Sequence, residues 1–201
     1  MQTPDIWQTL LPCDPRPLLA ASADPSARHL AMIAVFGRAA GDLEVEAVRR
    51  QAVGRPEVRA LVDSLPDWAP PYVFGGHASP AFAPNLLRLL FGLGVRAGDF
   101  PRVDAVLGAM QSHQADYGRF LTPGKPEAPW SSLPCDHFAI LEVLLLFGHG
   151  HTAPVGLGLK RLARTFDGTA QGPGWLCLPD PVARWRGPGR KGDLCPQVTV
   201  E

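Results

Sequence analysis

The stretch PRVDAVLGAM, residues 101–110, decides what kind of fold this chain has. Its apolar residues recur three and four positions apart: Val103, Val106, Leu107 and Met110. That spacing lines one face of an α-helix, and a proline suits the first helical turn because its missing N–H would have no partner there. The stretch PEVRALVDSL, residues 56–65, repeats the pattern, so we expect two amphipathic helices of one type.

A second kind of helix alternates with the first. Residues 26–36, 86–91 and 138–147 are apolar almost throughout, and glycine follows each of them, as at many helix C-termini. An apolar helix must be covered on every side. We therefore expect these stretches, including Leu144 and Leu145, to form an inner layer.

The amphipathic helices then form an outer layer. We expect them at 101–113 and at 154–166. In the second of these, a third copy of the proline pattern has a looser register, with its apolar stripe at Val155, Leu159, Leu162 and Phe166. Short segments that end in an aromatic residue follow the outer helices: LPDW at 65–68, QADYGRF at 114–120 and QGPGW at 171–175. Glycine permits a tight turn there, and the aromatic ring fills the gap between neighbouring hairpins, which gives Trp175 a structural role.

These features resemble the repeat of the prenyltransferase and squalene-cyclase (squalene oxidase) superfamily. The resemblance implies an all-α chain of repeated helical hairpins that forms an α/α toroid or part of one, over residues 24–201, with 1–23 as an N-terminal extension. The chain supplies about three and a half hairpins where such toroids have about five to seven. We therefore expect a piece of a longer protein, a short member or half of an assembly, with self-association through a C-terminal apolar edge at Leu162, Phe166 and Val198.

Composition restricts the partners and the surroundings of the chain. It has 201 residues, 46% of them hydrophobic, and its 19 basic and 19 acidic residues give a formal net charge of +0. Without a basic field it has little attraction for nucleic acid, and its longest apolar runs, at 30–36 and 143–147, are too short for a membrane span. Lacking a secretory signal and a dense cysteine framework, the chain is expected to be cytoplasmic with reduced thiols.

The resemblance also implies where function is located. In the superfamily the functional residues line a central cavity at the N-terminal ends of the inner helices, where the helix dipole favours anions and lowers the pKa of thiols. An apolar or isoprenoid-like small molecule is the implied ligand. The positions of this kind are Asn85, Cys135, Asp136, His137, Asp193 and Cys195.

A zinc site is one hypothesis for these residues. Asp193-Leu194-Cys195 resembles the Asp-x-Cys part of the zinc site in protein prenyltransferase β subunits. The later histidine of that family has no counterpart here, so four-coordinate zinc needs an upstream ligand such as His137, Cys135 or His77. We take Asp193, Cys195 and His137 as the candidate zinc ligands. The alternative is that Asp193 caps a helix and that Cys195 is a buried thiol.

Cys135, Asp136 and Asp193 are the candidate catalytic residues. Cys135 is followed by Asp136 and His137, which suggests a thiol nucleophile beside a base. Alternatively, Asp136 caps the helix and Cys135 is packed, because adjacent residues on a helix point in different directions. The Asp-x-Asp-Asp motif of class II terpene cyclases is absent, so cyclisation started by a carboxylic acid is not supported.

A basic loop at 184–191 completes the candidate residues. By resemblance to prenyltransferases, this loop holds a diphosphate through charge-assisted hydrogen bonds, and the alternative is a solvated loop. The candidate ligand-binding residues are Asn85, His137, Trp185, Arg186, Arg190 and Lys191.

The sequence thus leads to two hypotheses about function. The first is a prenyltransferase or squalene-cyclase repeat domain that binds an apolar or isoprenoid-like ligand, with transferase-like chemistry. The second is a non-catalytic helical-repeat scaffold that binds a protein partner. They differ in whether Cys135, Asp193, Cys195 and a histidine converge on one solvent-reachable cavity.

Overall fold

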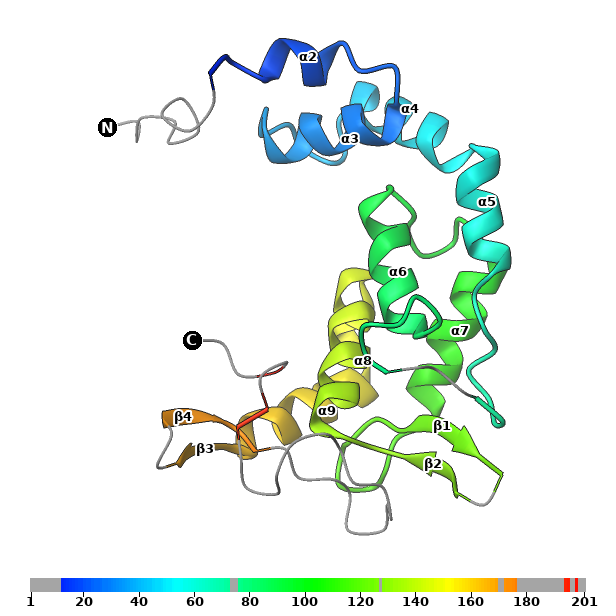
Figure 1. Cartoon of the computed structure of the whole chain (residues 1–201), viewed down its shortest axis with the longest axis vertical. Helices are drawn as coiled ribbons and strands as arrows, with labels where there is room; N and C mark the ends of the chain where they lie inside the picture. Colours follow the sequence, from blue (N-terminus) through cyan, green and yellow to red (C-terminus); the bar gives the residue numbers. More distant parts are fainter. Residues whose placement is uncertain are drawn as a thin grey trace. The chain divides into compact units, whose positions relative to one another are not determined.

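The computed structural model describes residues 12–72, 76–126, 128–169, 172–176, 194–195 and 198. Over these residues the chain is mainly helical, and its strands form two short β-hairpins (Figure 1). It divides into two compact units, of which the first runs to Leu61 and includes Leu90–Val95. The second comprises Val62–Leu89 and the described residues from Arg96 onward. No helix in the described ranges has the length and hydropathy that a membrane crossing needs.

Aspartate side chains start two helices of the first unit. Asp24 accepts a hydrogen bond from the N–H of Ser26 at 2.7 Å at the start of α3, which confirms the helix predicted there. Asp42 accepts from the N–H of Glu44 at 2.9 Å at the start of α4, a helix outside the predicted set. The helices of this unit are α2 (Arg16–Ala20), α3 (Pro25–Ala34) and α4 (Leu43–Val53).

The second unit holds most of the predicted inner and outer helices. The chain passes between the two units within α5 (Pro56–Asp63) and within α6 (Ala83–Gly92). The further helices of the second unit are α7 (Pro101–Ser112), α8 (Pro134–Leu146), the 3-10 helix η1 (His149–His151) and α9 (Ala153–Arg164). Its antiparallel hairpins pair β1 (Thr122–Lys125) with β2 (Ala128–Ser131) and β3 (Phe166–Thr169) with β4 (Gly172–Trp175).

Burial confirms the two helix types in α7 and α8, whereas the predicted inner helices at 26–36 and 86–91 are buried only in part, because Leu30, Val35, Phe36 and Leu89 are exposed. Helix α7 buries the predicted stripe, and most of α8 is buried, including Leu144. Leu145 is 43% exposed, so its predicted burial is wrong. The register predicted for α9 is also wrong, because Gly158 is buried where Leu159 was expected and Leu159 is exposed.

The segment QADYGRF has the structure that its composition predicts. Gly118 has a φ of +94°, and a β-carbon there would lie 2.9 Å from the carbonyl oxygen of Leu157 on α9. Gln114 donates to the carbonyls of Gly118 and Pro154 at 3.0 and 2.8 Å. Phe120 is fully buried. The glycine thus permits a turn against α9, and the aromatic ring fills the space behind it.

The C-terminal apolar edge differs from the prediction. Trp175 donates from Nε1 to the carbonyl of Leu162 at 2.8 Å, and its ring meets Phe166 edge-on with centroids 4.8 Å apart. Val198 is 1% exposed and packs in a cluster with Cys195. Phe166 is 48% exposed, so the predicted flank is uncovered at that residue and covered at Val198. Self-association through this edge stays a prediction.

Candidate metal and ligand site

His77 lies in the loop between α5 and α6, and two side chains hold that loop. The hydroxyl of Tyr72 donates to the carbonyl of Ala81 at 2.7 Å and accepts the N–H of Ala83 at 2.9 Å. Burial raises the pKa of Tyr72 to about 12, so this hydroxyl keeps its proton. Asn85, in the first turn of α6, donates to the carbonyl of His77 at 2.5 Å. Asn85 on α6 therefore fixes the backbone position of His77.

Cys135 and Asp136 come from the first turn of α8. Pro134 begins the helix, and Oδ2 of Asp136 accepts the N–H of Leu133 at 3.2 Å, which caps the helix N-terminus. Both side chains are buried. Because Oδ2 accepts the backbone hydrogen bond, Oδ1 of Asp136 can contact a side chain from another segment of the chain.

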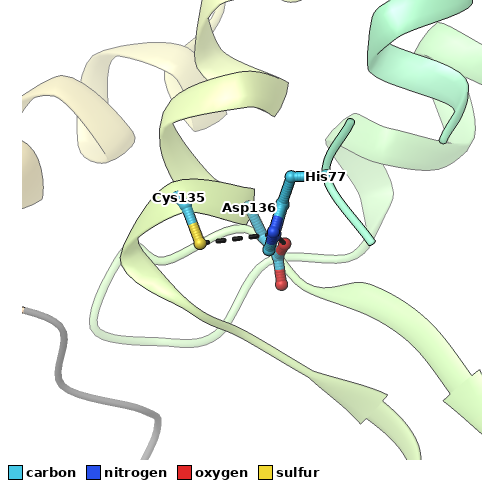
Figure 2. A group of neighbouring side chains, drawn as sticks. All are labelled: His77, Cys135 and Asp136. Carbon is cyan, nitrogen blue, oxygen red and sulfur yellow. Dashed lines mark hydrogen bonds and ion pairs between the residues drawn. The ribbon is translucent and has the colours of Figure 1, made fainter. Parts of the chain in front are cut away.

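These three side chains meet at one point (Figure 2). Nε2 of His77 lies 2.5 Å from Oδ1 of Asp136 and 3.3 Å from Sγ of Cys135. The three donor atoms all lie within 4.8 Å of one another. The thiol of Cys195 belongs to the same buried cluster as Cys135. Donor atoms from two distant segments of the chain, at 77 and at 135–136, therefore converge.

Electrostatic effects in this group disfavour a free thiolate. The hydrogen bond to Asp136 raises the pKa of His77. The hydrogen bond with Cys195, burial and the nearby charge of Asp136 raise the pKa of Cys135 well above its usual range. A thiol with a raised pKa stays protonated near neutral pH and is a weak nucleophile. Without a metal, the arrangement does not activate Cys135.

A cavity of about 440 Å³ adjoins the group. Its volume lies in the usual range for small-molecule pockets. The side chain of His77 is 17% exposed, so solvent reaches this side chain, whereas Cys135 and Asp136 are buried. The lining residues are His77, Phe82, Asn85, Arg88, Cys135, Phe138, Ala139 and Glu142.

His137 lies apart from this group, although it is close to Cys135 in sequence. Its Nδ1 accepts the N–H of Phe120 at 3.1 Å, and its Nε2 lies 3.1 Å from the carbonyl oxygen of Gly158, to which it donates. Burial lowers its pKa to about 4. Backbone groups thus engage both ring nitrogens of a neutral imidazole, and the histidine beside Cys135 is His77.

The structure brings some of the predicted site residues together and leaves others undescribed. Cys135, Asp136 and Cys195 lie in one group, and Asn85 lines the adjoining cavity. The three described cysteines are free thiols, which agrees with the expected reduced state. The remaining candidates lie outside the described residues: Asp193, Trp185, Arg186, Arg190 and Lys191.

Two polar residues of the lining were not predicted. Arg88 and Glu142 stand alone as charged residues in the apolar stretches 86–91 and 138–147. They form an ion pair across the cavity wall, with Nη2 of Arg88 2.5 Å from Oε2 of Glu142. A lone charge inside an apolar helix is the sequence signal that indicates them, because such a charge is costly unless it is paired or functional.

Comparisons with protein-family models, with curated proteins and with solved structures found no match for this chain. The site is therefore interpreted from its own residues and their geometry.

Proposed function

We propose that His77, Cys135, Asp136 and Cys195 bind a zinc ion. One imidazole, one carboxylate and two thiols form a donor set typical of zinc, whereas calcium and magnesium take oxygen ligands. One of the two spacings fits. Nitrogen and sulfur ligands of tetrahedral zinc lie about 3.6 Å apart, close to the 3.3 Å between Nε2 of His77 and Sγ of Cys135. The 2.5 Å between Nε2 of His77 and Oδ1 of Asp136 is a hydrogen-bond distance, shorter than the separation of about 3.4 Å between such ligands of tetrahedral zinc, so zinc binding would move these two atoms apart.

The observation that carries this proposal is that a single nitrogen of His77 faces both partners. In a nucleophilic relay of cysteine, histidine and aspartate, the thiol contacts one ring nitrogen and the carboxylate contacts the other. Here Nε2 of His77 faces both Cys135 and Asp136. Convergence of three donor atoms on one point is what a shared metal ion requires.

We propose further that the site and its cavity bind and transform a small molecule. A bound zinc ion supplies a Lewis acid and keeps its thiol ligands deprotonated. His77 is oriented by Asn85, and Asp136 by the backbone of Leu133, which are the supporting contacts that a metal site needs. Cys195 lies in the buried cluster around Cys135 but outside the group of three converging donor atoms, so we assign it to the coordination position that exchanges with the ligand.

The proposed reaction class is transferase-like chemistry on a partly apolar ligand, in a protein of the prenyltransferase and squalene-cyclase repeat type. The alternation of apolar and amphipathic helices in α6 to α9 supports it, as does the position of the site at the N-terminus of α8. Convergence of the donors beside a cavity favours this function over the interaction scaffold.

Metal analysis of the purified full chain tests the proposal. We expect one zinc ion per chain in the native protein, and strong loss of zinc in Cys135→Ser and in His77→Gln. Cys13→Ser and His151→Gln serve as matched controls, because both side chains are exposed and neither belongs to the group of donors or to the cavity lining. The controls should retain zinc at the native level.

Circular dichroism of each variant verifies that the helices are intact. Equal zinc content in the native protein and in folded Cys135→Ser would contradict the metal site.

A further inference from the structure

The cavity follows one face of α8. Cys135, Phe138, Ala139 and Glu142 all line it, at intervals of three and four positions. With a rise of about 1.5 Å per residue, Glu142 lies about 10 Å along the helix axis from Cys135. The cavity therefore has one end at the proposed zinc site and another at Glu142.

The wall between these ends is apolar. Phe138 and Ala139 come from α8, and Phe82 comes from the turn that precedes α6. The ring of Phe82 meets the ring of His77 edge-on, with centroids 5.3 Å apart. An apolar segment of a ligand would be in contact with these side chains over the middle of the cavity.

The far end of the cavity presents a hydrogen-bond acceptor. Nε and Nη2 of Arg88 both bind Oε2 of Glu142, at 2.7 and 2.5 Å, and Nη1 donates to Oδ1 of Asn85 at 2.8 Å. These contacts fix the guanidinium and neutralise the carboxylate. Within the described ranges, Oε1 of Glu142 accepts no hydrogen bond from the protein, and the side chain is 38% exposed.

We infer that the ligand has a metal-binding group at one end, an apolar middle that spans about 10 Å, and a neutral hydrogen-bond donor such as a hydroxyl or amide at the other end. The inference rests on the proposed zinc function. Because Arg88 and Glu142 neutralise each other, a carboxylate or an ammonium at the far end would lose its hydration without gaining a free counterion. A neutral donor has a smaller desolvation cost and binds Oε1 of Glu142.

Binding of three thiols to the cobalt-substituted full chain tests the inference. The visible absorption of Co²⁺ changes when a thiol enters its coordination shell, so a titration gives each dissociation constant. The probes are hexanethiol, mercaptohexanol and mercaptohexanoate, which share a six-carbon chain and differ in the far group. We expect mercaptohexanol to bind about tenfold more tightly than hexanethiol, the effect of one hydrogen bond to a charged group, and mercaptohexanoate to bind most weakly.

Two variants, Glu142→Gln and Ala139→Leu, and one control, Glu57→Gln, connect this preference to named residues. Glu142→Gln should remove most of the penalty for mercaptohexanoate, whereas Glu57→Gln, at an exposed position, should leave the order unchanged. Ala139→Leu should weaken all three thiols by filling the cavity, and the cobalt spectrum before thiol addition should stay as in the native protein. If Glu142→Gln does not fold, Ala139→Leu still tests the inference.

The outcomes separate this inference from the proposed function. Equal affinities for the three thiols, with a normal spectrum of bound cobalt, would overturn the inference and leave the metal site standing. Unchanged affinities in Ala139→Leu would overturn it as well. A protein that binds no cobalt would contradict the metal site, and the inference with it.

Discussion

The ring of Phe120 fills the space in which a side chain on Gly158 would begin. A β-carbon on Gly158 would lie 2.9 Å from Cε2 of Phe120 and 3.1 Å from Cδ2 of Leu141. The carbonyl of the same glycine accepts the hydrogen bond from His137. Helix α9 therefore approaches α8 closely at this position, with an aromatic ring and an imidazole packed between them.

Gly158→Ala should destabilise the protein by about 1 to 3 kcal/mol, because buried rings would have to move to admit the methyl group. Gly156 is a matched control on the same helix, since a β-carbon there meets no atom within 4 Å. Gly156→Ala should be neutral or stabilising by up to about 1 kcal/mol. Unfolding in urea measures both values. Equal stabilities of the two variants would contradict the close packing.

The neighbouring residues Leu144 and Leu145 on α8 allow a second comparison, between a buried and an exposed leucine. Leu144 is fully buried, and Leu145 is 43% exposed. Leu144→Ala should cost about 2 to 5 kcal/mol through the cavity that it leaves, and Leu145→Ala less than about 1 kcal/mol. Thermal or urea unfolding of both variants measures the difference. A cost for Leu145→Ala as large as that for Leu144→Ala would place both residues in the core.

Asp136 has two roles, and two substitutions separate them. Asp136→Asn keeps an oxygen that can accept the N–H of Leu133 but removes the negative charge that favours a metal ion. We expect it to weaken zinc binding, and in the metal-free protein to keep the helix cap while it weakens the contact with His77. Asp136→Ala should weaken zinc binding and also cost about 1 kcal/mol in the metal-free protein, because the helix cap is lost.

Zinc titration and metal-free unfolding of both Asp136 variants provide the measurements. If folded Asp136→Asn binds zinc with native affinity, then Asp136 caps the helix and is not a zinc ligand.

Cys195→Ser tests the exchangeable coordination position. The variant should still bind one zinc ion under excess zinc, because His77, Cys135 and Asp136 remain within 4.8 Å of one another. It should also bind a thiol probe more tightly than the native protein, because no protein thiol competes for that position. If Cys195→Ser loses zinc as completely as Cys135→Ser, then Cys195 is a permanent ligand and the position does not exchange.

Local patterns explain why the helices were predictable. The buried stripe of α7 is the one that the spacing in residues 101–110 predicts, since apolar residues buried on one face of a helix recur every three or four positions in the sequence. The register of α9 was not predictable in this way, because Gly158 is buried by close approach and carries no apolar side chain. Both β-hairpins contain glycine and proline, which favour loops in sequence, and their pairing depends on a neighbouring strand.

At the site, too, the residues that a local sequence pattern marks were predicted, and the residue that tertiary packing brings in was not singled out. Cys135 and Asp136 were identified from the start of α8, which is a local signal. Sequence proximity then favoured His137, but helix geometry turns that ring toward Phe120 and away from the thiol. His77 was one of several upstream alternatives, and its approach to Cys135 from 58 residues away is a product of tertiary packing.

The distance along the chain between these donors has a thermodynamic consequence. His77 and Cys135 are separated by 58 residues, and Cys195 belongs to a third segment. One ion bound to all three would cross-link the second unit. A cross-link removes conformations from the unfolded chain, and the entropy removed grows slowly with the length of the closed loop. Zinc would then stabilise this unit partly by restricting its unfolded state, as a disulfide does, and chelation would release that restriction.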